Sequence, residues 1–156
     1  MARPAEDLYE DDFYAWTRQQ AAIIRRLPVA DNRFDRDRVA GEIADLGKSE
    51  RDAVRSQVRR ILEHFLKLQY SPASTPRRDW QATIADFRAE LADKLTGTLR
   101  RDVRERLPIL YAAARRKAVL ALEEFGEAAV VAEIPETCPY GLANIVRDDW
   151  YPSPPA

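Results

Sequence analysis

Apolar residues recur every three or four positions through most of this chain, and this spacing constrains its fold more than any other feature. In an α-helix, residues three or four apart share one face, whereas a strand changes face at every residue. The clearest run steps by four, three, four and three, and consists of Val54, Val58, Ile61, Phe65 and Leu68. Strict alternation of apolar and polar residues hardly occurs. The spacing therefore predicts an all-α fold.

The spacing and the helix-breaking residues together predict a bundle of about five main helices. We expect helices over residues 10–26, 37–46, 50–70, 76–96 and 99–125. Gly47 is expected to end the second helix with a positive φ, and Ser49 to open a capping box for the third. Pro108 removes one backbone hydrogen bond inside the fifth helix, so we expect a kink or a short break there.

Each expected helix carries an apolar face that should be buried in a common core. On the first two helices these residues are Phe13, Trp16, Gln20, Ile23, Ile24 and Leu27, then Val39, Ile43 and Leu46. Leu62 and Leu66 widen the seam of the central helix. On the last two they are Trp80, Ile84, Phe87, Leu91 and Leu95, then Leu99, Val103, Leu107, Leu110, Ala114, Ala118, Leu122 and Phe125.

The chain length of 156 residues fits one domain, so residues 1–156 are expected to form a single helical domain. Its core should span about residues 8–126. Half of the ten prolines lie in the last thirty residues, which predicts an extended tail over about residues 127–156, with one short helix after Pro139. The tail should dock on the core because it is too apolar for a disordered segment, with Ile134, Tyr140, Leu142, Ile145, Trp150 and Tyr151.

The chain has a single cysteine, Cys138, which excludes an internal disulfide and favours a reducing compartment. The first residues contain no apolar stretch of signal-peptide length and turn acidic at once. Charges interrupt every hydrophobic run well short of the ~18 residues that a membrane helix requires. These features predict a cytoplasmic protein that does not enter a membrane.

Catalytic and metal-binding patterns are sparse. His64 is the only histidine, and Ile61 stands where a di-iron Glu-x-x-His pattern needs glutamate. Glu42 and Asp45 would share one helix face, but two carboxylates are too few to hold a divalent cation. No phosphate-binding loop, dinucleotide fingerprint or nucleophile elbow is present. We therefore expect no metal and no cofactor, and a non-enzymatic role over an enzymatic one.

The net charge of −1 hides an uneven distribution. Residues 48–117 carry 17 basic and 9 acidic residues, a balance of +8, while the remainder carries 8 and 17, a balance of −9. The basic middle can represent solvated helix faces that pair with acidic segments, or an anion-binding surface. We favour interhelical ion pairs for the arginine clusters near residues 59, 77, 100 and 115, and expect nucleic-acid binding to be weak.

The chain contains, in this order, residues 8–16 with Gln20, residues 42–51, residues 64–67 with Gln69, Tyr70 and Pro72, then Arg78, Trp80, Thr83, Ile84 and Arg88, and finally Pro135 with residues 138–140. Together these segments resemble the bacterial family called domain of unknown function 29. The resemblance covers nearly the whole chain. It implies a helical cytoplasmic protein and supplies no catalytic residues. Gly41 and Leu68 stand where such sequences often have glutamate and tryptophan.

The candidate site is a polar cluster made of Glu42, Asp45, His64, Lys67, Arg78, Trp80 and Thr83. Two functions remain open from the sequence. The favoured one is a non-catalytic interaction module or structural domain, which binds an unknown protein partner or itself. The alternative is an enzyme or nucleic-acid effector that uses the region of His64 and Arg78. An open cleft that gathers these groups would favour the alternative, whereas buried and mutually bonded groups would favour the first.

Overall fold

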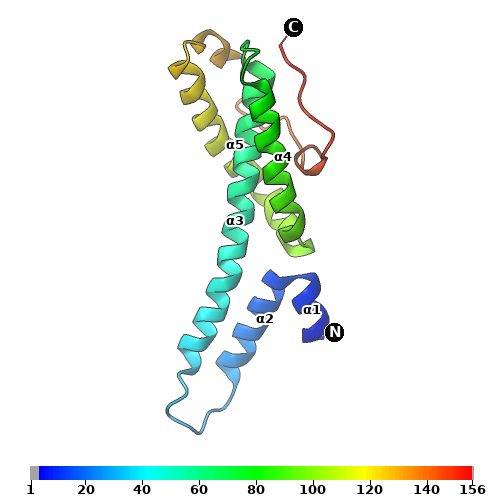
Figure 1. Cartoon of the computed structure of the whole chain (residues 1–156). Helices are drawn as coiled ribbons and strands as arrows, with labels where there is room; N and C mark the ends of the chain where they lie inside the picture. Colours follow the sequence, from blue (N-terminus) through cyan, green and yellow to red (C-terminus); the bar gives the residue numbers. More distant parts are fainter. Residues whose placement is uncertain (1–3, 156) are drawn as a thin grey trace.

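The computed structural model describes residues 4–155, and in that part of the chain all regular structure is helical, with no strand (Figure 1). Helices account for 74% of the structure. The predicted all-α fold is therefore confirmed. None of the helices in the described part combines the length and the apolar character that crossing a membrane requires.

The larger part of the molecule, which we call the head, is built from the C-terminal half of α3 (Arg36–Tyr70) with α4 (Arg77–Lys94), α5 (Gly97–Glu124) and the tail (Figure 1). The predicted seam of α3 lies at its centre. Val54, Val58, Ile61 and Phe65 are fully buried there, and Leu68 almost so. Their neighbours in the core include Ile84 and Leu91 from α4 and Leu99, Val103 and Leu122 from α5. The core residues predicted for these helices are largely confirmed.

The remaining part, which we call the arm, consists of residues 5–50. It contains α1 (Ala5–Asp11), α2 (Phe13–Arg26) and the N-terminal half of α3. Figure 1 shows α2 and this half of α3 side by side, projecting away from the head, with the loop that joins them at the far tip. The arm is thus only two helices thick for most of its length.

The predicted break at Gly47 is wrong, because α3 runs without interruption from residue 36 to residue 70. The residues expected to cap a new helix, including Ser49, lie inside it. Gly47 instead allows α2 to approach closely, since a Cβ added there would lie 2.0 Å from Oγ1 of Thr17. Its φ is not positive, and Gly126, where φ is 75°, is the only described glycine in the left-handed region. Position 47 does require glycine, but the reason is the close packing of α2 and not a helix end.

The first predicted helix is divided at Asp12, which was expected to lie inside it. Asp12 has φ −154° and ψ 79°, and its side chain accepts a hydrogen bond from the amide of Ala15 at 3.1 Å. It therefore caps α2, as aspartate at this position commonly does. α1 ends just before it and folds back along α2.

Of the kink or short break predicted at Pro108, the break does not occur, because α5 is continuous across this residue. Proline removes one backbone hydrogen bond, but Val103, Leu110 and Tyr111 on either side are buried in the core and hold the helix together. Phe125, predicted to be buried, is exposed at the end of α5, and Gly126 follows with the positive φ that ends a helix.

The C-terminal segment packs along the head through a 3-10 helix, η1 (Ala128–Glu133), and a short helix, α6 (Leu142–Val146). Its buried side chains include Ile134, Tyr140, Leu142 and Ile145. The short helix expected after Pro139 is α6, and it begins after Gly141. Arg88 of α4 is the main polar anchor. Its guanidinium donates to the carbonyls of Ile145 and Asn144, both at 2.9 Å, and of Trp150 at 2.8 Å.

Candidate functional site

The seven candidate residues do not form one cluster. Glu42 and Asp45 lie on the arm, and Asp45 pairs with Lys48 at 3.4 Å. About 19 helical residues separate Asp45 from His64, which corresponds to roughly 30 Å along α3. Arg78 is exposed, and Thr83 donates from its hydroxyl to the Asp79 carbonyl of its own helix at 2.9 Å. Lys67 and Trp80 line one groove of the head, and His64 lies one turn before Lys67 on α3.

His64 is buried, with its side chain bonded to its own helix. Nδ1 lies 2.7 Å from the carbonyl oxygen of Arg60, to which it donates in the neutral ring. Burial lowers the pKa of His64 below its ordinary value of 6.5, and the nearby Lys67 acts in the same direction. The bond to the Arg60 carbonyl and the charge of Glu63 oppose this shift without reversing it. His64 is therefore a neutral, oriented side chain near pH 7.

Lys67 forms an ion pair with Glu63 one turn earlier, at 3.2 Å. Both side chains are largely buried, with exposed fractions of 15% and 9%. The second carboxylate oxygen of Glu63 is buried and has no hydrogen-bond partner. The pair neutralises the Lys67 ammonium. This arrangement suits Lys67 to a structural role better than to that of a free base.

A groove of about 360 Å³ lies beside this pair at the end of the head. It runs between the C-terminal part of α3, the start of α4 and the end of α5. Its walls are mostly apolar, and they consist of Lys67, Ala73, Pro76, Trp80, Ala121, Leu122, Phe125 and Glu127. Lys67 and Trp80 are the two predicted site residues that it brings together. Such a surface can accept an apolar group next to one ion pair.

A second groove, of about 460 Å³, is basic. It lies between α3 and α5 and is lined by Ser56, Arg59, Arg60, Ala113, Arg116, Lys117 and Leu120. The sequence predicted interhelical ion pairs for such clusters, but among residues 4–155 none of these four cations forms one. Arg60 instead stacks over the ring of Phe87 at 5.5 Å. We call this feature the basic groove.

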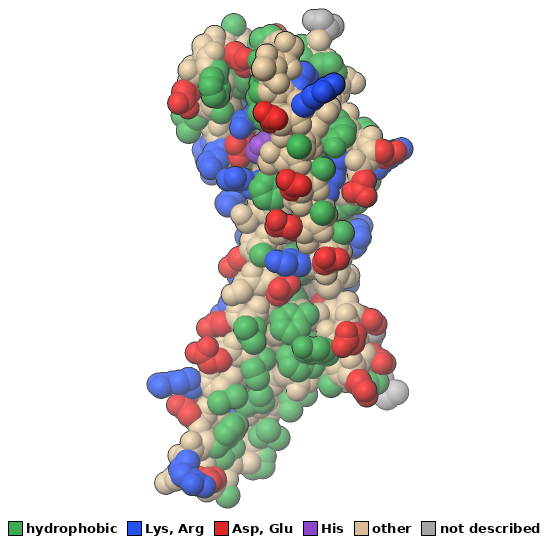
Figure 2. Space-filling model, viewed as in Figure 1, with side chains coloured by type: hydrophobic (Ala, Val, Ile, Leu, Met, Phe, Trp, Pro, Cys, Tyr) green, Lys and Arg blue, Asp and Glu red, His purple; other side chains and the backbone are tan. Residues whose placement is uncertain are grey.

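The arm exposes an apolar face that the sequence assigned to the core. Phe13, Trp16, Ile23 and Leu27 share one side of α2, and Val39 and Leu46 share one side of α3. Because the two helices are antiparallel, both sides face the same way, and Figure 2 shows apolar side chains gathered over both. The exposed fractions reach 45% for Leu27 and 56% for Leu46. We call these six residues, together with Tyr9, the arm face.

Two small residues explain why the arm face is left exposed. Thr17 and Ala21 are the buried residues of α2, and they pack toward Ala40 and Gly47 of α3. This close contact places the larger side chains at the flank of the pair. Near the head, the rings of Tyr9, Phe13 and Trp16 pack on one another, with centroids 4.9 to 5.7 Å apart. The predicted burial is therefore wrong for Ile23, Leu27, Val39 and Leu46, which are exposed. The other residues predicted for these two faces are half-buried, namely Phe13, Trp16, Gln20, Ile24 and Ile43.

Polar contacts join the arm to the head. Asp12 accepts hydrogen bonds from the hydroxyl of Thr96 and the amide of Thr98, both at 3.0 Å, so that one carboxylate serves the starts of α2 and α5. Burial alone would raise the pKa of Asp12, but these hydrogen bonds outweigh burial and hold the pKa below its ordinary value. Asp12 was not a predicted site residue, although an aspartate just before an apolar helical run is a capping signal.

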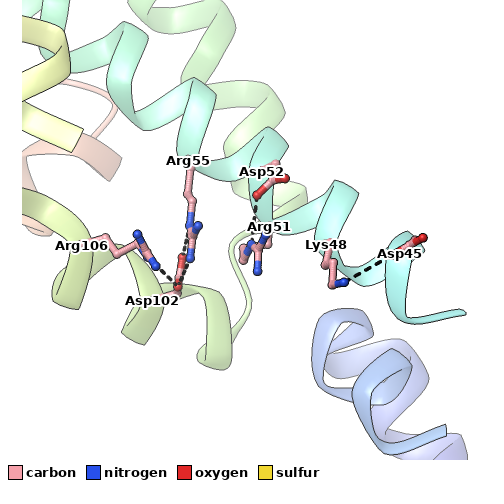
Figure 3. Close-up of polar contacts among 7 residues, drawn as sticks. All are labelled: Asp45, Lys48, Arg51, Asp52, Arg55, Asp102 and Arg106. Atoms are coloured by element: carbon pink, nitrogen blue, oxygen red, sulfur yellow. Dashed lines mark hydrogen bonds and ion pairs between the residues drawn. The ribbon is translucent and has the colours of Figure 1, made fainter. Parts of the chain in front are cut away.

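Figure 3 shows a row of charged side chains where α3 passes from the arm to the head. Arg55 makes a two-point contact with Asp102 of α5, at 2.8 and 2.6 Å, and Arg106 approaches the same carboxylate at 4.0 Å. The hydrogen bond from Arg55 is the main cause that lowers the pKa of Asp102. These contacts fix α5 against α3 beside the arm.

Within residues 4–155, no three His, Cys, Asp or Glu side chains are grouped so that they could hold a metal ion.

Arg88 was also missed as a key residue. Ile84, Arg88, Leu91 and Leu95 are spaced by four, three and four residues, so Arg88 is a charged residue within an apolar helix face. Such a residue is rarely buried unless it is paired, and this was the sign in the sequence that Arg88 has a structural partner. Its guanidinium is held between the rings of Phe65 and Tyr151, at 5.4 and 5.1 Å. Burial lowers the pKa of Arg88, while Tyr151 and Asp148 favour its charged form. Its partners come from the tail, which the spacing of α4 could not identify.

The fold and these surfaces define a class of helical protein with a compact head and a projecting two-helix arm. The family model of the domain of unknown function DUF29 matches residues 8–151. The chain belongs to this family.

A solved structure has the same fold. It is an alpha-helical protein of unknown function from Rhodospirillum rubrum, with 23% sequence identity and a TM-score of 0.79, and the match covers 96% of this chain and 92% of the other. No match was found among curated proteins.

Proposed function

We propose that this protein is a non-catalytic interaction module of the cytoplasm, and that the arm face is its binding surface. One observation carries the proposal: the apolar side chains of the arm face follow the same helical spacing as the core of the head, yet five of the seven are exposed and the other two are only half-buried. Large exposed apolar patches on a folded protein commonly mark interaction sites. The cluster of Tyr9, Phe13 and Trp16 fits this role, because aromatic residues are enriched in interface cores.

The geometry of the head supports the same function over catalysis. His64 is buried and bonded to its own helix, and Lys67 is neutralised by Glu63. Neither His64 nor Arg78 is among the residues that line the groove beside Lys67. An active site would need an acid or base that can reach a substrate. The polar candidates bond within their own helices or face solvent, which suits a structural role better than a catalytic one.

The experiment is a pull-down from native lysate with the wild-type chain and with a double variant, Ile23→Glu with Leu46→Glu. Both side chains are exposed, so the variant should keep its helical circular dichroism and melting temperature. We expect it to lose the captured proteins. The matched control is Ile109→Glu, which places a glutamate on an exposed aliphatic residue of the head that lies outside both grooves. Equal capture by all three chains would overturn the proposal.

The basic groove favours a second candidate function, the binding of nucleic acid. Its four cations can contact phosphates, and such binding weakens steeply with salt. We expect only non-specific contacts, no tighter than ~10⁻⁶ M at physiological salt, because the groove offers charge without a base-reading element. Fluorescence anisotropy with duplex DNA and single-stranded RNA measures this. Nanomolar binding that Arg60→Ala reduces, in a chain of unchanged fold, would make the basic groove the functional surface.

A further inference from the structure

We infer that the partner of the arm face is a second copy of this chain, which packs antiparallel to the first about a twofold axis. This inference rests on the proposed function and names its partner. Two arms that meet through their apolar faces form four helices around a shared core. Four-helix bundles of this kind are stable arrangements, and twofold dimers are the commonest oligomers.

The size of the apolar surface fits such a dimer. Five of the large apolar side chains that are exposed lie on the arm face, namely Tyr9, Ile23, Leu27, Val39 and Leu46. A large side chain that is about half exposed leaves roughly 60 to 100 Å² to cover, so these five offer on the order of 400 Å². Half-buried Phe13 and Trp16 add to this. A standard interface buries about 800 Å² per partner, so the arm face of each copy supplies about half of the area that one partner contributes, or more.

The distribution of charge along the arm indicates whether two arms pair parallel or antiparallel. At the base of the arm, residues 4–12 contain five acidic residues and no basic one, and Glu6, Asp7 and Glu10 are exposed there.

At the tip, residues 25–38 contain five arginines and three aspartates. Each of those aspartates pairs with an arginine of the tip, as Asp31 with Arg33, Asp35 with Arg38 and Asp37 with Arg36. Arg25 and Arg26 remain exposed and have no ion pair within residues 4–155.

An antiparallel pair places the tip of each chain next to the base of the other. Arg26, three residues after Ile23, lies at the edge of the arm face, so that the Arg26 of one copy then lies near the acidic α1 of its partner, twice over by symmetry. A parallel pair would instead bring like charges together at both ends, which is unfavourable. The apolar groups match in the same way, because the aromatic cluster at the base of one arm meets the aliphatic residues at the tip of the other.

Gln20 lies midway along the α2 part of the arm face, between Trp16 and Ile23. In the antiparallel dimer the two copies of Gln20 meet near the twofold axis. Their amides can bond each other there, since an amide both donates and accepts. A single polar residue in an apolar helical interface commonly fixes its register.

Sedimentation equilibrium on the full chain tests the pairing. We expect a dimer at tens of micromolar for the wild type and for Ile109→Glu, and a monomer with unchanged melting temperature for Ile23→Glu with Leu46→Glu. A wild type that stays monomeric at that concentration would overturn the inference. In that case the pull-down separates the two ideas. If Ile23→Glu with Leu46→Glu still loses the proteins captured from lysate, the self-pairing inference fails and the proposed function stands. If this variant still captures them, the proposed function fails as well.

Cysteine cross-linking tests the direction, in a Cys138→Ser background. Gln20→Cys should oxidise to a covalent dimer, whereas Ala22→Cys, exposed on the opposite side of α2, should not. A mixture of Trp16→Cys and Ile23→Cys chains should give mainly the mixed dimer, since these positions flank Gln20 on either side. Predominant Trp16→Cys homodimers would show a parallel pair and contradict the antiparallel arrangement.

Discussion

The head and the arm use the same helical spacing of apolar residues, but only the head buries them within the chain. In the head, α3 has neighbours on several sides, because α4, α5 and the tail all pack on its C-terminal half. In the arm it has essentially one neighbour, α2, which it contacts through small side chains. Amphipathic spacing therefore predicts which face of a helix is to be covered. It does not say whether the cover comes from the same chain.

The largest effect should come from a matched pair of leucines on α3. Leu62 is fully buried in the head, and Leu46 is 56% exposed on the arm. Leu62→Ala should cost about 2 to 5 kcal/mol of unfolding free energy, because it leaves a cavity in a packed core. Leu46→Ala should change stability by less than ~0.5 kcal/mol in the monomer. Urea unfolding at a concentration where the chain is monomeric measures both. Similar losses for both variants would remove the contrast between head and arm.

The next largest effect concerns the anchor between the head and the tail. Arg88→Met keeps much of the side-chain volume but removes the donors to the carbonyls of Ile145, Asn144 and Trp150. We expect a loss of roughly 2 to 3 kcal/mol, since buried acceptors are left unpaired. Limited proteolysis should then cut the tail faster. The control is Arg78→Met, an exposed arginine of the same helix, which should do neither. A resistant tail in Arg88→Met would show that apolar packing alone holds it.

Two glycines of the arm provide a smaller test. In Gly47→Ala the new Cβ would meet the Thr17 hydroxyl oxygen at 2.0 Å, so α2 must shift, which we expect to cost about 1 to 2 kcal/mol. In Gly41→Ala the Cβ meets nothing within 4 Å, and the better helix propensity should stabilise the chain by roughly 0.5 to 1 kcal/mol. Thermal melting of both variants gives the sign. A stabilised Gly47→Ala chain would show that α2 is loosely held.

The smallest effect is the pH dependence due to His64. Its pKa is lowered by burial in the folded head, so the unfolded chain binds the proton more readily. Its contribution to stability is complete above pH 6.5, the ordinary value, and is lost as the pH falls through the lower folded value. We expect the wild type to lose more stability than His64→Gln between pH 7 and pH 5. Parallel melting-temperature profiles for the two chains would contradict this.

The sequence predicted the helices of the head well because their boundaries and their buried faces depend on local signals. The seam from Val54 to Leu68 and the helix end at Gly126 are examples. The sequence-based predictions were wrong where the role of a residue is set by contact with a segment that is distant in the sequence. Gly47 looks like a helix end until Thr17 is placed against it, and Arg88 looks like a surface charge until the tail carbonyls surround it.

The candidate site was less predictable for the same reason. Lys67 and Trp80 do line one groove, with His64 one turn before Lys67, but Glu42 and Asp45 belong to the arm because the expected break in α3 is absent. The arginine clusters were expected to find carboxylates. Arg77 and Arg115 instead donate to backbone carbonyls of the loop after α3 and of the tail. Such acceptors belong to every residue and leave no trace in the sequence.

The continuity of α3 also has a mechanical consequence. At 35 residues this helix is about 52 Å long, and it belongs to the arm at one end and to the head at the other. No loop on it can absorb rotation, and Asp12 together with Arg55 braces the neighbouring helices at the crossing point. A molecule that binds the arm face is consequently held at a fixed distance and in a fixed orientation relative to the grooves of the head.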